Sequence, residues 1–142
     1  KKWLDDGCDE GCHVNAVYAT VREDGSSMDA VSLLTLASIH GHVPMVEMLI
    51  ERGGDVDIVV GSSCETPLMS ICHAGSSAAL HDRVLPAMTT LLRHRASVNL
   101  QDQNGVTALM RASRGGNIRA IKLLLQHGAQ SMQFKPFTEA QR

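Results

Sequence analysis

Aromatic residues are scarce in this chain of 142 residues, which has one tryptophan, one tyrosine and two phenylalanines. Leu, Ile, Val, Ala and Met must therefore form its core, which suits thin stacked helices that leave no deep interior for large rings to fill. The sequence also lacks a run of about 18 apolar residues and a signal-peptide pattern, so it predicts neither a membrane span nor export. We expect a cytoplasmic or nuclear protein.

Motifs of several enzyme classes are missing as well. The sequence has no Gly-rich phosphate loop, no Gly-x-Ser-x-Gly, no His-Glu-x-x-His and no paired carboxylates on one helix face. We therefore predict no catalytic residues, no cofactor and no enzyme activity.

Four cysteines could suggest zinc or disulfides: Cys8, Cys12, Cys64 and Cys72. Cys8 and Cys12 lie close to His13, but structural zinc ligands usually come as two matching pairs, and here the second pair is missing. The sequence therefore predicts reduced thiols and no metal site.

The clearest pattern in the chain runs from Gln103 to Ala129. Asn104-Gly105 is a turn signal, and Thr107 can cap a helix that Gly115-Gly116 would end. A second helix then follows, ending at Gly128. Its predicted buried residues are Ile118, Ile121, Leu124 and Leu125.

Two helices of about ten residues cannot form a stable core alone, so similar units are expected elsewhere in the chain. Thr66-Pro67-Leu68 and Ser32-Leu33-Leu34 repeat the start of the unit. The second helix recurs at 46–50 and 88–92. Each recurrence is followed by a small residue and then a Val-Asx pair, Val56-Asp57 or Val98-Asn99.

These units resemble the ankyrin repeat, whose pattern is T-P-L-H-x-A-A-x-x-G-H, then V-x-x-L-L, then G-A-D-V-N. Gly41-His42 matches the glycine and histidine of that pattern. The resemblance implies an all-α solenoid of stacked helix-turn-helix units with β-hairpin-like finger loops. It also implies a non-catalytic scaffold or adaptor that binds a protein partner.

The spacing of the units predicts that the whole chain forms a single ankyrin-repeat domain. We expect this domain to be part of a longer solenoid. The expected segments are a partial repeat with a long β finger (1–24), a repeat (28–60), a repeat with an insertion near 76–84 (61–100), a repeat (101–133) and a partial or capping helix (134–142).

An insertion follows from the intervals between repeats, which are 34 residues from Ser32 to Thr66 and 41 from Thr66 to Thr107. The family repeat is about 33 residues long. The extra residues could lengthen the second helix backwards or form a loop. Because Pro86 opposes an unbroken helix, we predict a loop that ends in a short helical turn.

Charge is divided unevenly along the chain. Residues 1–65 contain four Lys/Arg and twelve Asp/Glu, whereas residues 66–142 contain nine and three, although the net charge of the whole is only −2. Such a dipolar solenoid can orient a charged segment of a partner. A basic C-terminal end contacting nucleic acid is the alternative, and the scarcity of aromatic residues argues against it.

Candidate binding residues lie at the positions of the first helices that the family pattern leaves variable, and at the finger tips. They are Leu36, Ile39, His40, Ser70, His73, Arg111 and Arg114 on the helices, and Arg22, Glu23, Asp24, Gln101, Asp102, Gln103 and Asn104 on the fingers. We expect all of these side chains to be exposed.

Overall fold

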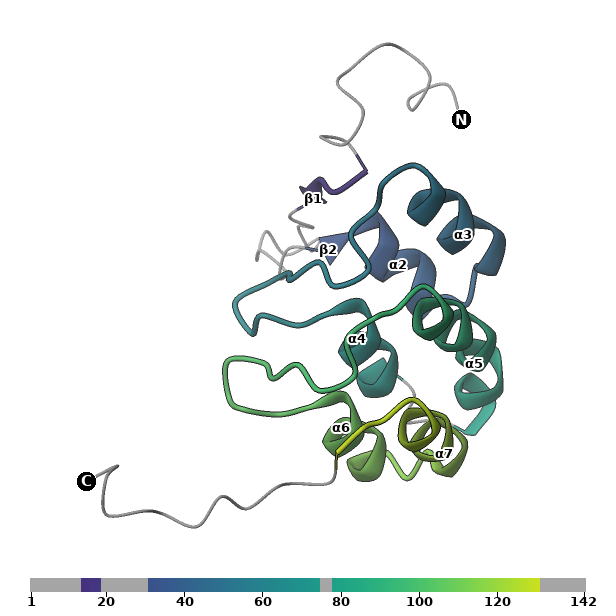
Figure 1. The fold of residues 1–142 in the computed structure, drawn as a ribbon, viewed down its shortest axis with the longest axis vertical. Coiled ribbons are helices and arrows are strands. Elements are labelled where there is room, and N and C mark those ends of the chain that lie inside the picture. Colours follow the sequence, from purple (N-terminus) through teal and green to yellow (C-terminus); the bar gives the residue numbers. More distant parts are fainter. Residues whose placement is uncertain (1–13, 19–30, 75–77, 131–142) are drawn as a thin grey trace, which may run out of the picture.

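The computed structural model describes residues 14–18, 31–74 and 78–130 of the chain. Its helices stack in pairs along one axis, and the connecting loops extend to one side (Figure 1). The first helices of the pairs are α2 (Leu33–Ile39), α4 (Pro67–Ala74) and α6 (Ala108–Arg114), and the second helices are α3 (Val43–Glu51), α5 (Ala78–Arg93) and α7 (Ile118–Gln126). The predicted all-α repeat solenoid is confirmed.

The stack has two layers of helices. α4 contacts α2 and α6 in one layer, while α5 contacts α3 and α7 in the other. Two short strands, β1 (Val17–Tyr18) and β2 (Val31–Ser32), pair in antiparallel fashion immediately before α2. They form the base of the predicted β finger, whose remaining residues 19–30 lie outside the described part of the chain.

The first helices begin at hydroxyl caps. The hydroxyls of Ser32, Thr66 and Thr107 accept hydrogen bonds from the backbone N–H three residues later, at 3.1, 3.3 and 3.3 Å. Such a bond satisfies one of the donors that the first turn of a helix leaves unpaired. This local chemistry explains why one sequence pattern starts a helix three times.

A glycine after the first helix sets the turn to the second. Gly41 has φ of +69° and Gly116 has φ of +67°, a left-handed conformation that side chains disfavour. Space is also limited at the first of these positions, because a Cβ on Gly41 would lie 2.5 Å from the carbonyl oxygen of Arg83. The turn thus brings α5 of the next repeat close to the backbone.

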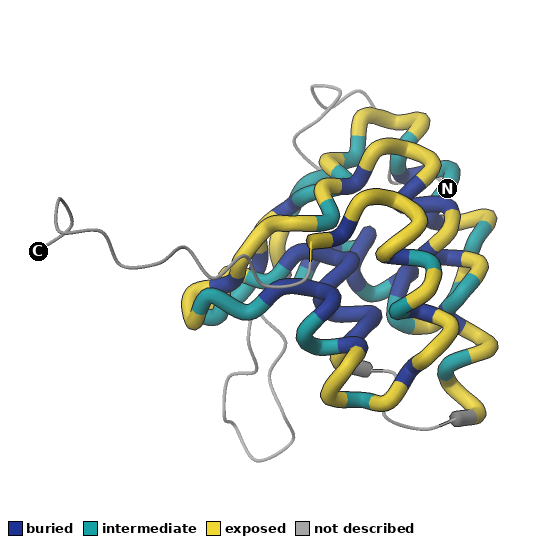
Figure 2. The backbone as a smooth tube through the Cα atoms, turned by 60° about the horizontal axis from the view of Figure 1, so that its bottom comes forward, coloured by how far each residue is buried: buried dark blue, intermediate teal, exposed yellow. Residues whose placement is uncertain are grey.

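Leucines at equivalent positions form the core between the two layers. They are at most 9% exposed, and they are Leu34, Leu68 and Leu109 from the first helices and Leu49, Leu91 and Leu124 from the second. Figure 2 shows buried positions along the inner sides of the helices and exposed ones at the turns. The apolar core is therefore continuous from repeat to repeat, and each repeat depends on its neighbours.

The insertion in the middle repeat is helical, and the prediction of a loop is wrong for its described residues. α5 spans sixteen residues with Pro86 inside it, against nine residues in α3. Val84, Ala87 and Met88 on either side of the proline are at most 1% exposed. Their burial offsets the hydrogen bond that proline cannot donate.

Two of the four side chains that were predicted to be buried on α7 are exposed. Ile118 is 65% and Leu125 is 50% exposed, while Leu124 is fully buried and Ile121 packs against the core. The corresponding residues of the preceding repeat, Leu85 and Leu92, are covered. Helical periodicity identified the apolar residues but not which of them a neighbouring helix covers.

Asn or Asp side chains tie each repeat to the next. Asn15 donates to the carbonyl of Gly53 and accepts from the N–H of Asp55, and Asn99 makes the same two bonds to Gly128 and Gln130. The intervening tie is made by Asp57, which accepts two hydrogen bonds from Ser97. We call these three residues the Asx ties.

None of the helices formed by the described residues is both long and apolar enough to cross a membrane.

Candidate functional site

Two rows of side chains run along the first helices of the stack. The shift of 34 positions that takes Ser32 to Thr66 also takes Leu36 to Ser70 and Ile39 to His73. The shift of 41 positions to Thr107 takes these rows to their last members. The inner row is therefore Leu36, Ser70 and Arg111, and the outer row is Ile39, His73 and Arg114.

The outer row is the more accessible of the two. His73 and Arg114 are exposed, Ile39 is half-buried, and His40 beyond the row is exposed as predicted. The inner row differs from the prediction: Leu36 is half-buried, but Ser70 is only 8% exposed and the Arg111 side chain only 11%. Exposure was therefore a wrong expectation for Ser70 and Arg111.

The burial of Arg111 results from its contacts with two loops. Its Nη2 lies 2.9 Å from a carboxylate oxygen of Glu65 and 2.5 Å from one of Asp102. Glu65 precedes α4 and Asp102 lies in the loop before α6, so the arginine joins two successive fingers. The Nε of Arg111 is buried and has no hydrogen-bond partner among the described residues.

Asp102 was predicted at a finger tip as an exposed contact, and this expectation is wrong as well. Its side chain is only 1% exposed. Burial would raise the pKa of this carboxyl, but the N–H groups of Val106 and Asn104 and the Arg111 guanidinium hold it below its ordinary value. Asp102 therefore stays ionised, and its hydrogen bonds stabilise the loop before α6.

A pocket of about 510 Å³ opens between these fingers and helices α4 and α6. Its lining residues are Ser63, Glu65, Cys72, His73, Asp102, Asn104, Val106, Arg111, Arg114 and Gly115. Five predicted binding residues thus line one pocket, contributed by two adjacent repeats: His73, Asp102, Asn104, Arg111 and Arg114. Ser70 contacts it indirectly, because its hydroxyl lies 3.4 Å from Glu65.

The two cysteines of the described residues differ in accessibility. Cys72 is buried, and burial raises the pKa of its thiol to about 12, which Arg111 only partly opposes. A thiol with this pKa is almost never a thiolate at neutral pH and is a poor nucleophile. Cys64 is a free, exposed thiol, and no cluster of possible metal ligands occurs within the described ranges.

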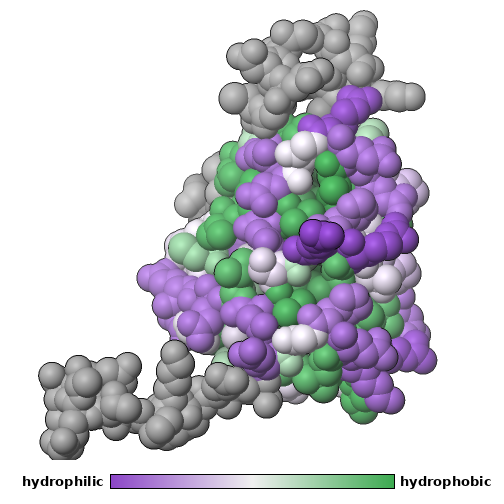
Figure 3. All heavy atoms as spheres, viewed as in Figure 1, coloured by the Kyte–Doolittle hydropathy of each residue, from purple (hydrophilic) through white to green (hydrophobic). Residues whose placement is uncertain are grey.

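The remaining predicted finger residues fall into two groups. Gln101 and Gln103 flank Asp102 in the chain and are exposed. Arg22, Glu23 and Asp24 lie outside the described residues. Figure 3 shows hydrophilic side chains at the lower left, over the end of the finger before α6, and over the outer helices, with hydrophobic side chains between them.

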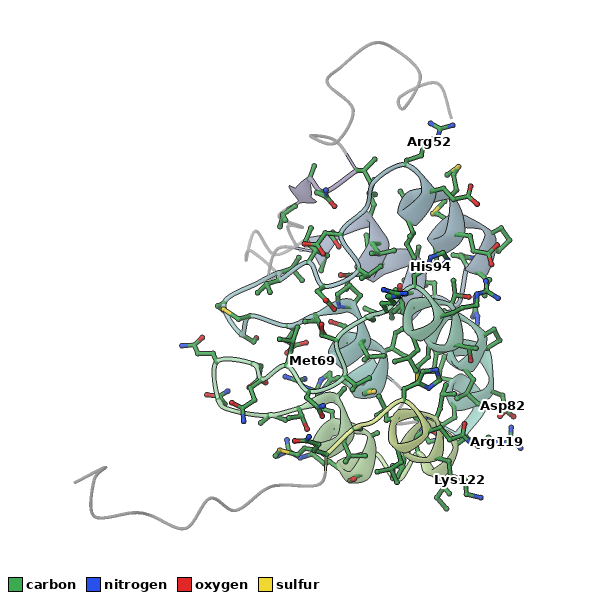
Figure 4. The ribbon with its side chains drawn as sticks, in the orientation of Figure 1. Arg52, Met69, Asp82, His94, Arg119 and Lys122 are labelled. Atoms are coloured by element: carbon green, nitrogen blue, oxygen red, sulfur yellow. The ribbon has the colours of Figure 1, made fainter. Side chains whose placement is uncertain are left out.

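Basic residues on the outer helices pair with acids of neighbouring repeats. Arg93 on α5 lies 2.9 Å from Glu47 on α3, and Arg119 on α7 pairs with Asp82 on α5. Figure 4 shows Asp82 and Arg119 together at the outer edge of the stack, and Lys122 near them on α7. These ion pairs are exposed, so each contributes about 0 to 1 kcal/mol of stability.

Sequence reasoning missed Glu65 as a member of the pocket. Its position directly before the cap Thr66, equivalent to Val106 before Thr107, gives no local signal that it pairs with a residue of the next repeat. An acid at that position lies beside Arg111 of the next repeat.

Comparison with known families gives two matches. The family described as "Ankyrin repeats (3 copies)" matches residues 76–141, and the family described as "Ankyrin repeat" matches residues 31–59. Together they cover more than half of the chain.

Two curated proteins have the same sequence identity to this chain. The mouse "B-cell lymphoma 3 protein homolog" is 30% identical over 117 residues, which are 82% of this chain and 24% of that protein. The Caenorhabditis elegans "Ankyrin repeat and KH domain-containing protein mask-1" is 30% identical over 122 residues, covering 72% of this chain and 4% of that protein. The chain thus spans less than a quarter of the length of either relative.

Proposed function

Because the chain belongs to the ankyrin-repeat family, we propose that its stacked repeats bind a partner protein through α2, α4, α6 and the adjoining fingers. Ankyrin repeats are generally protein–protein interaction modules, and the family is generally non-catalytic. We call this proposed site the finger face. It acts as a scaffold or adaptor surface without chemistry of its own.

The observation that supports this proposal is that core, capping and exposed residues occupy different positions along the first helices. Positions such as Leu34, Leu68 and Leu109 fill the core, and Ser32, Thr66 and Thr107 cap the helices. The outer row makes neither contact: His73 and Arg114 are exposed. Side chains that are not needed for folding, aligned across successive repeats, form an extended surface of the kind that solenoids use for binding.

The alternative of nucleic-acid binding has less support. Two of the exposed basic residues on the outer helices, Arg93 and Arg119, have carboxylate partners. Binding to the phosphate backbone requires several unpaired cations on one face. We therefore favour a protein partner.

A site-specific crosslinking experiment tests the finger face. A partner is first isolated by affinity capture with the chain and then purified. Photo-reactive benzoylphenylalanine replaces His73 on the finger face or, as a control, Lys122 on α7. We expect crosslinks to the partner from position 73 and few or none from position 122. Crosslinks from position 122 alone would show that the partner binds the outer helices. Fluorescence anisotropy with single-stranded RNA and duplex DNA at low salt checks the alternative, for which we expect no binding.

A further inference from the structure

Chemical character changes along the two rows of the finger face. At the α2 end the rows offer Leu36 and Ile39, two half-buried aliphatic side chains. In the middle only the imidazole of His73 is exposed, because Ser70 is 8% exposed and its hydroxyl lies beside Glu65. At the α6 end the outer row finishes with the exposed cation of Arg114. The surface is therefore apolar at one end and cationic at the other.

The groups available at the mouth of the pocket are hydrogen-bond donors. Both carboxylates in the lining, Glu65 and Asp102, are engaged by Arg111, and the Asp102 side chain is only 1% exposed. Arg114 is exposed, and no carboxylate of the described residues pairs with it. The Nε–H of Arg111 also lacks a partner in the described ranges, but it is buried and is not one of the groups available at the mouth.

His73 and Asn104 line the same pocket and are exposed, and each can donate through a ring N–H or an amide NH₂. His73 and Asn104 can also accept hydrogen bonds, whereas Arg114 can only donate, so a ligand acceptor with a negative charge matches Arg114. The lining carries two carboxylates, Glu65 and Asp102, and two cations, Arg111 and Arg114, so its net charge is zero and Arg114 is the cation left without a carboxylate among the described residues. This limits the fit to a single carboxylate and disfavours a polyanion.

We propose that the finger face binds an extended segment of a partner protein with an acidic side chain in this pocket and an apolar side chain over Leu36 and Ile39. The inference rests on the proposed function and adds the chemistry and direction of the bound segment. Neighbouring helices lie about 8–10 Å apart, so the two anchor points are separated by about 20 Å. An extended chain covers that distance in about six residues.

The test uses the whole chain as bait for a random peptide library displayed on phage, with peptides of about 12 residues, long enough to span three repeats. Two variants serve as matched baits: Arg114→Ala removes the exposed cation of the pocket, and Lys122→Ala removes an exposed cation of the outer helices. Circular dichroism verifies that both variants are folded. A selected peptide is then synthesised with its acidic residue intact, changed to Gln and changed to Lys.

We expect the wild-type and Lys122→Ala baits to enrich peptides with an acidic residue about six positions from an apolar one. Changing the peptide Glu to Gln should weaken binding to wild type about fivefold or more, the worth of about 1 kcal/mol. The same change should alter binding to Arg114→Ala less than about twofold. A third variant with the charge reversed, Arg114→Glu, should bind the Lys peptide better than wild type does.

Peptides that bind the finger face with no acidic preference would overturn this inference and leave the proposed function standing, provided that they compete with the partner. An acidic preference that Arg114→Ala retains, or that Lys122→Ala loses, would also overturn it. Enrichment of no peptide at all would count against both proposals.

Discussion

The carboxylate of Asp57 accepts hydrogen bonds from both the backbone N–H and the hydroxyl of Ser97, each 2.8 Å long. The two residues lie 40 positions apart in adjacent repeats. Asn15 and Asn99 occupy the corresponding positions of their own repeats and also reach the following repeat. One side chain per repeat thus ties neighbouring fingers together.

Removing the tie should weaken the stack. We expect Asp57→Ala to lower the free energy of unfolding by about 1 kcal/mol, because two partly exposed hydrogen bonds are lost. Asp57→Asn should stay within about 0.5 kcal/mol of wild type, since Asn makes the same kind of tie at positions 15 and 99. Urea unfolding measures both, and equal stability of the Ala variant and wild type would show that the tie contributes nothing.

Asp102 should make stability depend on pH in the acid range. Its pKa is lowered from an ordinary value of 3.8, so the stabilisation is fully present above that value and is lost as pH falls through the folded-state pKa. We expect Asp102→Asn to lose about 1–3 kcal/mol at pH 7 and less as the pH falls below about 4.

Urea unfolding between neutral pH and the acid limit measures this difference. Asp82→Asn is the control, because its carboxylate is 66% exposed and its ion pair with Arg119 should contribute less than about 1 kcal/mol. A constant difference between wild type and Asp102→Asn down to the lowest pH would contradict the assignment.

Adjacent leucines of α7 should respond very differently to truncation. Leu124 is 0% exposed and Leu125 is 50% exposed. We expect Leu124→Ala to destabilise the protein by about 2–5 kcal/mol and Leu125→Ala by less than about 1 kcal/mol, because only the first leaves a cavity. Thermal or urea unfolding compares them directly, and similar losses would mean that α7 is rotated from its assigned orientation.

Gly41 should tolerate alanine poorly. Its φ is +69°, and a Cβ would lie 2.5 Å from the Arg83 carbonyl oxygen. We expect Gly41→Ala to cost about 2 kcal/mol or more, because backbone strain of about 1 kcal/mol is joined by a clash with α5. Gly53→Ala carries similar strain at φ +90° with no atom within 4 Å, so it should cost only about 1 kcal/mol. An equal cost for the two would remove the clash from the explanation.

Features that depend on a few consecutive residues could be predicted from the sequence. Ser32 and Thr107 cap their helices as expected, and Gly116 ends the turn after α6. Each of these interactions is closed within about four residues, so the pattern contains all of its partners.

Features that depend on another repeat could not be predicted in the same way. The sequence of its own helix predicts that Arg111 is exposed. In the structure, Arg111 contacts Glu65, which lies 46 positions earlier in the chain. The helix across Pro86 likewise carries Val84 and Met88, which are at most 1% exposed, and this helix contacts α3 and α7 of the other repeats. In both cases, contacts with another repeat outweighed what the neighbouring sequence indicates.

The Asx ties also bear on how the stack would respond to a pulling force. Each tie joins one finger only to the next, so tension applied between α2 and α7 would pass through them in series, alongside the helix contacts. Because each tie offers a similar pair of bonds, the load would release one module at a time. The domain would then lengthen in steps as successive repeats separate. When the force is removed, it would shorten again, starting from the repeats that stayed packed.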